Sequence, residues 1–476
     1  MDGRLTLGAL VLALAAWIGA VLIAWPTYDG MNHATGVVAA CADAALHGEA
    51  PGLPRGESFL GTLYFPPVPL LVAGAHRLGM SWHAALRWVN LAGMLALIIA
   101  VAMAGQSLGG SGVSFTVALS LLLVSFPFMA ASIAGRADPW AAAFSIGALA
   151  AWCRDPRRRG WLAPALAAAS WLIKATSFTV PLAVLLSSAA PGARRAAGPF
   201  AARFFAAVAA GVVLTIPWHG PGWYADVLHT LAFAPPNITT PLRGPFELLR
   251  YLASLGELAV AAGLAIVYLT GEWSRGRPVR PFAIASLALT VLVMANRGSD
   301  HNHLLELTAL GAVGAGMWAE RATRREAVLG MALVLIVVTG AAWRETQAAV
   351  RAARAPEARR ENVLAAVRGE SGPVLAEDAL IPLAAGLRPE ISDASTLRSE
   401  IGRGEPRATA IVERIQARHY GLIVLDENLE LQKDRWYRDF QFGAAARDAM
   451  LSRYVAAGES DGFWLYRPRS AVNGAP

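Results

Sequence analysis

The sequence is poor in cysteine and in charged side chains. Only two cysteines occur among 476 residues, Cys41 and Cys153, and the topology developed below places them on opposite membrane faces, where they cannot pair. A disulfide framework and a cysteine-based zinc site are therefore excluded. Charged residues make up only 16% of the chain, against about 25% in soluble proteins, whereas 55% of the residues are hydrophobic. This balance is typical of an integral membrane protein.

The sequence also lacks the short motifs that bind nucleotides. Residues 344–476 hold no nucleotide fingerprint, no glycine-rich phosphate loop and no metal-ligand spacing.

Basic residues outnumber acidic ones by 7, but the residues from Arg344 onward hold 19 of each sign, so the whole excess lies in residues 1–343. There the basic residues occupy short loops between hydrophobic runs, where they set membrane topology. We therefore expect no nucleic-acid partner.

Long hydrophobic runs predict a mainly α, polytopic membrane helix bundle. The first run, from Leu5 to about residue 25, is long enough to cross a bilayer and too long for the core of a signal peptide, so we expect it to be retained. About eleven spans are predicted, near residues 5–25, 84–104, 112–133, 140–153, 161–175, 177–190, 199–217, 251–270, 281–296, 303–319 and 326–343.

The run from Pro66 to Leu78 decides the predicted topology. It has about 13 residues, fewer than the roughly 20 that a span needs, and its prolines favour a position along the membrane surface. The arginine-rich loops between the later spans then face the cytoplasm, as the positive-inside rule requires. We therefore expect a multi-pass protein of the inner (plasma) membrane, with a cytoplasmic N-terminus and an extracytoplasmic C-terminus.

The composition changes at residue 344. Residues 1–343 are predicted to form the transmembrane domain, and residues 344–476 a small extracytoplasmic α/β domain. The elements expected in this second domain are helices over 345–370, 405–418 and 443–451, strands over 373–376 and 421–425, and a hairpin of 454–456 with 463–466.

The predicted topology places most ionisable side chains of the membrane domain on its outer face. Asp29 directly follows the first span, at a depth where a carboxylate is costly unless it is solvated, paired or used. It is either a helix-capping acid or a reactive group. Asp138 and Arg136 share a second, very short outer loop, either as a self-satisfied pair or as part of a site. A transporter would place such groups nearer the bilayer midplane.

Two further groups of polar residues belong to the same face. Lys174 lies near the outer end of its span, where a lysine either snorkels to the interface or binds a phosphate. A polar run between two later spans contains Asp300, His301, Asn302, His303 and Glu306. Asp300, His301 and His303 could ligate a divalent metal, although their spacing is not a diagnostic zinc pattern.

Four stretches of this outer face follow one another in a characteristic order. They are Tyr28-Asp29-Gly30 after the first span, the ledge from Tyr64 to Pro69, Gly135-Arg136-Ala137-Asp138-Pro139, and the stretch from Ile173 to Ser177. Together they resemble the GT-C superfamily of glycosyltransferases, and in particular its family 39-like group, which includes protein O-mannosyltransferases and lipid A aminoarabinose transferases. The run 298–306 resembles a motif of bacterial members.

The resemblance implies an inverting hexosyl- or pentosyltransferase that takes a sugar from a polyprenyl-phosphate donor and passes it to a lipid, glycan or protein acceptor. It implies two catalytic acids, Asp29 as the base for the incoming nucleophile and Asp138 in the second loop. Lys174, Arg136 or Arg243 would stabilise the leaving phosphate. The remaining candidates for substrate binding are His33, Tyr64, Asp300, His301, Asn302 and Glu306.

A cofactor is not required by these residues. Tyr28-Asp29-Gly30 carries one acid and not a pair, which argues against a tightly bound metal, while a divalent metal stays open. Two other classes also stay open, namely a transporter or flippase for a lipid-linked glycan and a non-catalytic membrane subunit with an outer interaction domain. Contacts with membrane lipids are expected for all three. Activity that depends on Asp29 would distinguish the enzyme from the other two.

Overall fold

The computed structural model describes most of the chain as two compact units. The described residues are 3–28, 30–49, 61–62, 64–155, 160–188, 194–219, 222–233, 242–271, 278–295, 301–355, 358–431 and 436–469. The helical unit comprises Met1–Pro26, Asn90–Leu214 and Pro236–Ala353. The mixed unit comprises Thr27–Val89, Thr215–Pro235 and Arg354–Pro476.

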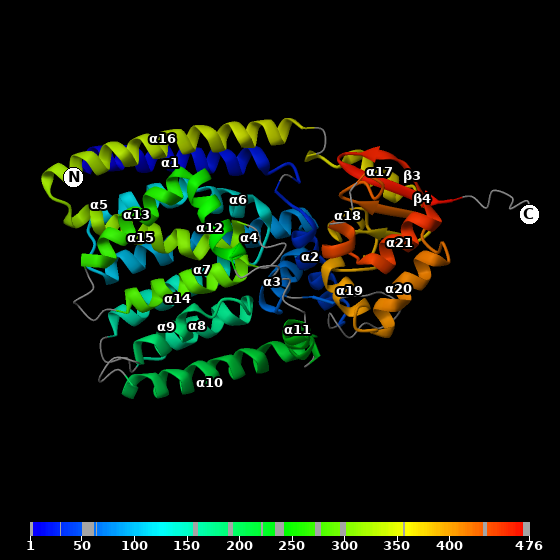
Figure 1. Ribbon diagram of the computed structural model, residues 1–476, viewed down its shortest axis with the longest axis horizontal. Coiled ribbons are helices and arrows are strands. Elements are labelled where there is room, and N and C mark those ends of the chain that lie inside the picture. Colours follow the sequence, from blue (N-terminus) through cyan, green and yellow to red (C-terminus); the bar gives the residue numbers. More distant parts are fainter. Residues whose placement is uncertain are drawn as a thin grey trace, which may run out of the picture. The chain divides into compact units, whose positions relative to one another are not determined.

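The helical unit is built from apolar helices that run in similar directions (Figure 1). Its elements, some of which continue into the mixed unit, are α1 (Gly3–Ala24), α4 (Trp82–Ser107), α5 (Gly112–Val124), α6 (Phe126–Ala134), α7 (Asp138–Arg154), α8 (Leu162–Ile173), α9 (Thr179–Ser188), α10 (Arg194–His219), α12 (Arg243–Ser254), α13 (Gly256–Gly271), α14 (Val279–Met294), the 3-10 helix η1 (His301–Leu304), α15 (Leu305–Arg321) and α16 (Arg324–Arg354). Each predicted hydrophobic run is therefore helical.

Helix α15 lies at the centre of this unit. It packs against α5, α7 and α13, while α14 packs against α9. Small residues allow the close approach: a Cβ at Gly314 would lie 2.6 Å from the Cβ of Ala265 on α13, and one at Gly316 would overlap the carbonyl of Ser114 on α5. Glycines at such positions are typical of helices that pack closely inside membranes.

The predicted span 112–133 is broken. Helices α5 and α6 meet at an angle of 62°, because the chain leaves the helix at Ser125 and Pro127 offers no N–H to continue it. The N–H of Phe126 donates to the carboxylate of Glu257 over 3.0 Å, and Arg344 binds the same carboxylate at 2.8 Å. This buried polar contact satisfies the backbone where the helix stops.

By length and composition, four of the described helices can each cross a membrane, or up to six if each bent pair counts as one span. The pairs are α5 with α6 and α12 with α13, the latter bent by 107°. Predicted spans such as those at α8, α9 and α14 correspond to shorter apolar helices, so the count of about eleven is not confirmed. The chain is a multi-pass membrane protein.

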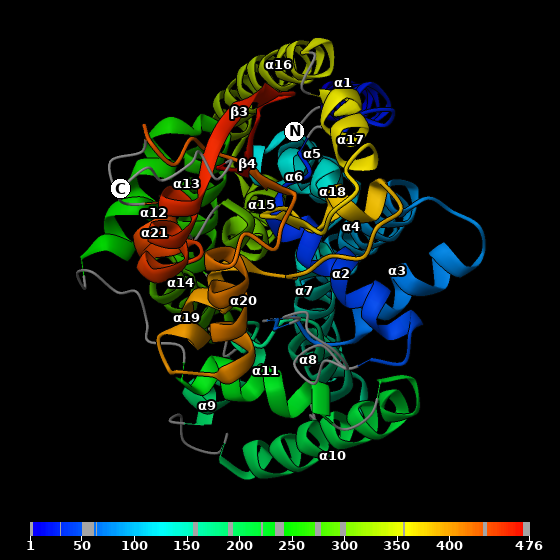
Figure 2. The ribbon, with the colours of Figure 1, turned by 90° about the vertical axis from the view of Figure 1, so that its right-hand side faces the viewer.

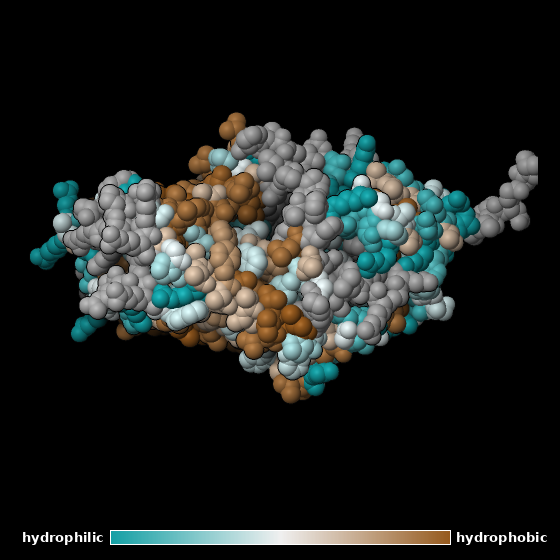
Figure 3. All heavy atoms as spheres, turned by 90° about the horizontal axis from the view of Figure 1, so that it is seen from below, coloured by the Kyte–Doolittle hydropathy of each residue, from teal (hydrophilic) through white to brown (hydrophobic). Residues whose placement is uncertain are grey.

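Large hydrophobic side chains remain exposed on the helical unit. They include Phe205, Val213 and Leu214 on α10, and Val328, Leu329 and Ile336 on α16. Figure 3 shows hydrophobic side chains gathered on the face that it views. Exposed apolar area of this extent indicates contact with lipid.

The mixed unit contains a small sheet. Its elements are α2 (His33–Leu46), α3 (Pro67–Arg77), α11 (Gly222–Phe233), α17 (Glu361–Arg368), β1 (Val374–Ala376), α18 (Leu380–Ala384), α19 (Ala394–Ile401), α20 (Pro406–Gln416), β2 (Leu422–Leu425), the π-helical turn η3 (Trp436–Phe440), α21 (Ala444–Arg453), β3 (Tyr454–Ser460) and β4 (Phe463–Pro468). The strand order is β1-β2-β4-β3, with β1 and β2 parallel and the other neighbours antiparallel.

Helices cover both faces of this sheet. Ile423 and Leu425 of β2 pack with α19, α20 and α21, whereas Leu422 and Val424 pack with α17 and α18. Side chains alternate along a strand, so a strand buried on both faces must be apolar throughout, as β2 is. Figure 2 shows α17 and α18 on one side of the strands and α20 and α21 on the other.

One expectation for the end of the chain differs from the structure. The predicted helix 345–370 is two helices, because α16 continues to Arg354 and α17 begins only after Arg360, whose φ of 55° is left-handed. The compact units divide after Ala353, and residues 27–89 group with the C-terminal part. The domains 1–343 and 344–476 stay a prediction. The predicted surface segment 66–78 contains the 11-residue helix α3, which is too short to span.

Candidate active site

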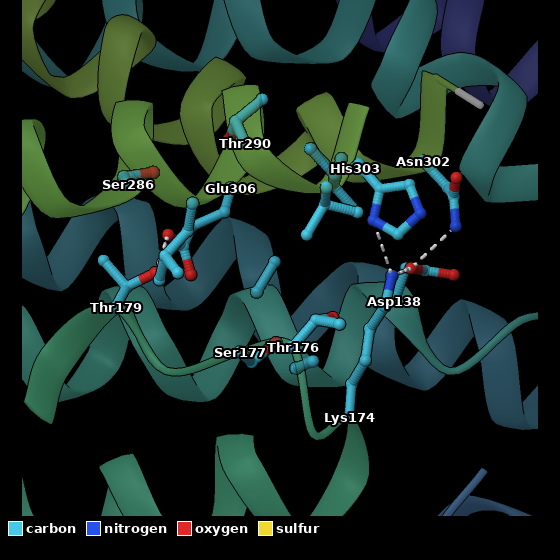
Figure 4. A pocket seen from close by; sticks show the side chains of 15 residues that line it. Asp138, Lys174, Thr176, Ser177, Thr179, Ser286, Thr290, Asn302, His303 and Glu306 are labelled. Carbon is cyan, nitrogen blue, oxygen red and sulfur yellow. Dashed lines mark hydrogen bonds and ion pairs between the residues drawn. The ribbon is translucent and has the colours of Figure 1, made fainter. Parts of the chain in front are cut away.

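An open pocket in the helical unit gathers four of the predicted site residues. Its space amounts to about 460 Å³, part of which is open solvent. It is lined by the start of α7, the segment between α8 and α9, α14, η1 and the start of α15 (Figure 4). Asp138, Lys174, Asn302 and Glu306 all line it. The sequence places these residues on three separate segments, and the packing of α14 on α9 and of α15 on α7 brings them together.

Local sequence explains where Asp138 and Lys174 sit. Gly135 ends α6 with a φ of 68°, a left-handed conformation that glycine adopts without strain, and the chain turns there. Asp138 and Pro139 then open α7, where a proline is tolerated because the first N–H groups have no helical partner. Lys174 follows α8 in an extended conformation, so its side chain leaves the helix at the pocket.

Asp138 and Lys174 form an ion pair inside the pocket. The ammonium of Lys174 donates to Oδ1 of Asp138, and the side-chain amide of Asn302 donates to the same oxygen over 3.0 Å. Asp138 is only 4% exposed, and the Lys174 side chain is 16% exposed. A carboxylate this deeply buried requires a cation or several donors, and Lys174 supplies the cation.

Lys174 also contacts His303. Its Nζ lies 3.3 Å from Nδ1 of that ring. An ammonium has three N–H groups, so the contacts with Asp138 and His303 leave one donor for a ligand. Figure 4 shows the Lys174 side chain rising to the point where Asp138, Asn302 and His303 meet. The arrangement presents a fixed positive charge to an anion that enters the pocket.

Glu306 belongs to a second polar group of the same pocket. Its Oε1 accepts a hydrogen bond of 2.6 Å from the hydroxyl of Thr179, the first residue of α9. Ser286 and Thr290 of α14 also line the pocket and are buried. The hydroxyl-rich segment at Thr176 and Ser177 lies between the two groups in Figure 4.

Three buried polar atoms of this pocket have no hydrogen-bond partner within the described part of the chain. They are Oδ2 of Asp138, Oδ1 of Asn302 and Oγ of Ser286. Buried polar atoms in folded proteins are almost always paired, so unpaired atoms in a pocket indicate a ligand or water. All three atoms belong to residues that line the pocket.

The structure does not bring every predicted residue into this pocket. Arg136 is buried near Asp138, and its positive charge favours the ionised form of that carboxyl group. The backbone N–H of Arg136 donates to the side-chain oxygen of Asn90 over 3.2 Å. His301 packs edge-on against Phe126, and Arg243 begins α12; neither is among the pocket residues.

Two candidates lie in the mixed unit. Nδ1 of His33 lies 4.0 Å from the carboxylate of Asp426, and the ring packs edge-on against Trp436. The backbone carbonyl of Tyr64 accepts a hydrogen bond of 2.9 Å from the indole of Trp223. Asp29 and Asp300 fall outside the described residues.

Sequence reasoning missed Thr179, Ser286 and Thr290. Each lies in an apolar run, where a hydroxyl more often bonds to the backbone of its own helix than to a ligand. Such residues carry no sequence signal until packing shows which face of the helix borders the pocket. His303 was considered only as a metal ligand, and the structure places it beside Lys174.

The described residues of this pocket form no ligand set for a divalent metal, and Asp29 and Asp300 lie outside the described residues. Among the described residues no group of three or more His, Cys, Asp or Glu side chains is arranged to hold a metal ion. The ammonium of Lys174 already lies where a cation would sit against Asp138. We therefore assign no step to a metal.

The fold is similar to those of solved membrane-protein structures. The chain superimposes on ArnT from Cupriavidus metallidurans bound to undecaprenyl phosphate with a TM-score of 0.65 and 12% identity, covering 100% of both chains. It matches the oligosaccharyltransferase AglB from Archaeoglobus fulgidus, in complex with an inhibitory peptide and a dolichol-phosphate, with a TM-score of 0.56 and 12% identity over 97% of this chain and 74% of AglB.

The chain has the GT-C fold. No protein-family model matches the sequence, and a comparison with curated protein sequences gave no match. At 12% identity the likeness to ArnT and AglB establishes the fold alone. The GT-C fold predicted from short motifs is thereby confirmed over the whole chain.

Proposed function

We propose that this GT-C chain is a membrane glycosyltransferase that takes a sugar from a polyprenyl-phosphate donor and transfers it to a lipid, glycan or protein acceptor outside the cytoplasm. The observation that carries the proposal is the buried Lys174–Asp138 pair in an open pocket with unpartnered polar atoms. The full-length match to ArnT, whose structure contains undecaprenyl phosphate, supports a lipid phosphate as the anion.

Lys174 is the group that receives the donor phosphate in this proposal. A lysine is a compact cation well suited to a phosphate, and its remaining N–H group is available for one phosphate oxygen. When the bond between the sugar and the phosphate breaks, negative charge grows on the leaving phosphate. An ammonium held in place stabilises that charge without reorganising.

Asp138 acts through Lys174. Its carboxylate holds the ammonium in position together with Asn302, so loss of Asp138 would displace the cation. Asp29 is proposed as the general base that takes the proton from the acceptor nucleophile. The nucleophile bonds to the anomeric carbon, the bond from that carbon to phosphate oxygen breaks, and polyprenyl phosphate leaves. This single displacement inverts the sugar configuration.

The proposed orientation of the chain in the membrane is the topology predicted from the arginine-rich loops. It has about eleven spans, a cytoplasmic N-terminus in the inner membrane and residues 344–476 on the outer side. Donor, acceptor and pocket then meet at the outer ends of the helices. A transporter would need ionisable groups along a path through the bilayer. In the described pocket the ionisable groups lie at the start of α7, directly after α8, in η1 and at the start of α15.

The experiment uses purified full-length protein in lipid nanodiscs with a pool of polyprenyl-phosphate sugars and crude acceptor. Asp29→Asn keeps the size of the side chain but removes its basicity, so transfer should fall by roughly 10²–10⁴-fold, while binding of undecaprenyl phosphate stays near the wild-type value. Lys174→Met should weaken that binding. Ser145→Ala, which removes a buried hydroxyl of α7 outside the pocket, is the matched control.

Wild-type transfer by folded Asp29→Asn protein would end the role proposed for this acid. Movement of a lipid-linked glycan across the membrane without transfer to an acceptor would instead establish the transporter.

A further inference from the structure

The candidate pocket has two chemically different ends. Figure 4 shows Lys174, Asp138, Asn302 and His303 gathered at one end, and Glu306, Thr179 and Ser286 at the other. The first end carries a cation and suits a phosphate. Among the described residues the second end has no cation, and its polar lining is a carboxylate and aliphatic hydroxyls beside apolar side chains such as Leu289 and Val293.

We propose that the Glu306 end is a subsite for a neutral, polyhydroxylated group, namely the glycosyl group of the lipid-linked donor. The proposal rests on the proposed function and assigns a substrate class to the second end of the same pocket. Glu306 would accept hydrogen bonds from sugar hydroxyls, and Ser286 would donate to one of them.

The hydrogen-bonding capacity of the residues supports this assignment. Glu306 is half-buried and uses Oε1 for Thr179, which leaves Oε2 to accept from a ligand. The hydroxyl of Ser286 is buried and has no partner within the described residues. A sugar hydroxyl both donates and accepts, so it pairs with Glu306 and Ser286 together. A sugar hydroxyl uses both functions, donating to Glu306 and accepting from Ser286, whereas an ammonium can only donate.

The spacing of the two ends fits a sugar joined to a phosphate. Helix η1 runs directly into α15, so His303 and Glu306 are three positions apart along continuous helical chain. Side chains at this separation are neighbours, with about 5–6 Å between their Cβ atoms. This is close to the width of one sugar ring. In the proposal, a phosphate bound by Lys174 beside His303 has its glycosyl group on the side of Glu306.

The alternative role of these residues is purely structural. The Glu306–Thr179 hydrogen bond ties α15 to α9, and loss of such a tie would lower stability without changing which lipid binds. The decisive quantity is therefore a ratio, the affinity for sugar-bearing lipid divided by the affinity for sugar-free lipid. A structural tie would affect both affinities alike.

The test measures binding by the full-length protein in nanodiscs. The probes are undecaprenyl phosphate without sugar and the same lipid carrying glucose, galactose, mannose, arabinose or glucosamine. Glu306→Gln should lower the affinity for the preferred neutral glycolipid roughly 10- to 100-fold, the effect of losing hydrogen bonds to a charged group, and leave the sugar-free lipid within about 3-fold. Ser286→Ala should lower the same affinity by roughly 3- to 10-fold.

Matched controls lie elsewhere in the same helices. Glu320→Gln changes a glutamate at the far end of α15, where it binds Ser111, and Ser145→Ala removes an unpartnered buried hydroxyl outside the pocket. Both should leave the ratio unchanged. Lys174→Met should weaken sugar-bearing and sugar-free lipids alike.

Three other outcomes would contradict the subsite, its preference for neutral sugars or the proposed function. If Glu306→Gln lowers the affinity for both lipids equally, or for neither, the proposed subsite is wrong. The proposed function still stands in that case if binding of the sugar-free lipid depends on Lys174. If only the glucosamine lipid depends on Glu306, the subsite recognises a cation and the assignment to neutral sugars is wrong. If no undecaprenyl phosphate lipid binds, the proposed function falls and the subsite with it.

Discussion

The buried pair of Asp138 and Lys174 allows a quantitative prediction. Lys174→Met replaces the lysine with an uncharged chain of similar length, so the change removes the cation and preserves most of the packing. Among the described residues, the Asp138 carboxylate, 4% exposed, then keeps the neutral amide donor of Asn302 and the positive charge of nearby Arg136. Asp138→Asn is the reciprocal change, and it leaves a 16%-exposed lysine side chain facing an amide.

The magnitude follows from the burial of each partner. Removing one member of a buried ion pair typically costs about 3–5 kcal/mol, and the open pocket places Lys174→Met near the lower limit, at about 3 kcal/mol. Asp138→Asn should cost about 2 kcal/mol because Lys174 reaches more solvent. The double variant has no unpaired charge, so it should lose only about 1–2 kcal/mol. The expected coupling is therefore about 3–4 kcal/mol.

The assay is a double-mutant cycle on the full-length protein in one detergent, with unfolding by urea followed through tryptophan fluorescence. The chain contains 15 tryptophans, so the signal is strong. Ser145→Ala serves again as the control for a buried polar deletion on α7. Additive effects, with the double variant as unstable as the sum of the two single variants, would refute the ion pair as described.

Three further predictions concern other parts of the chain. Burial raises the pKa of Glu377 to about 7, so the folded protein holds a proton that the unfolded chain releases near pH 4.5. The free energy of unfolding should therefore fall by roughly 2–3 kcal/mol as the pH rises from 4.5 to 7. Glu377→Gln should flatten this part of the pH profile measured by urea unfolding. Arg344→Met should destabilise the protein by about 3 kcal/mol, because it leaves the Glu257 carboxylate at the break between α5 and α6 without its cation. In the double variant, Glu257→Gln should restore part of the lost stability. Single cysteines at residues 79–83 should react with an impermeant maleimide added outside spheroplasts, and labelling only from the cytoplasmic side would reverse the predicted topology.

Glu377 shows how the mixed unit differs from the pocket. Its carboxylate is 1% exposed and accepts hydrogen bonds from Tyr437, Trp436 and the backbone N–H of Asp426. The neighbouring Asp378 is paired with Arg360, which also donates to the carbonyl of Met31 over 2.7 Å. These acids are satisfied mainly by protein groups, whereas the acids of the pocket face space that a ligand can enter.

The secondary structure was largely determined by local sequence. The apolar runs became helices, and the strands at 373–376 and 421–425 became β1 and β2 within one residue. A hydrophobic run commits a segment to a helix because the backbone must satisfy its own hydrogen bonds in lipid. Sequence could not locate the break at Ser125, because the carboxylate that satisfies Phe126 comes from Glu257, 131 positions away.

The sequence alone also nominated Asp138, Lys174, Asn302 and Glu306, because ionisable and amide groups beside apolar spans are costly unless they are paired or used. Only the tertiary structure decided their partners. Lys174 lies 36 positions from Asp138, and Asn302 lies 164 positions from it, so no local rule links them. The hydroxyls of Thr179 and Ser286 entered the site only when α9 and α14 packed together, since a helix face becomes a pocket wall through its neighbours and not through its own sequence.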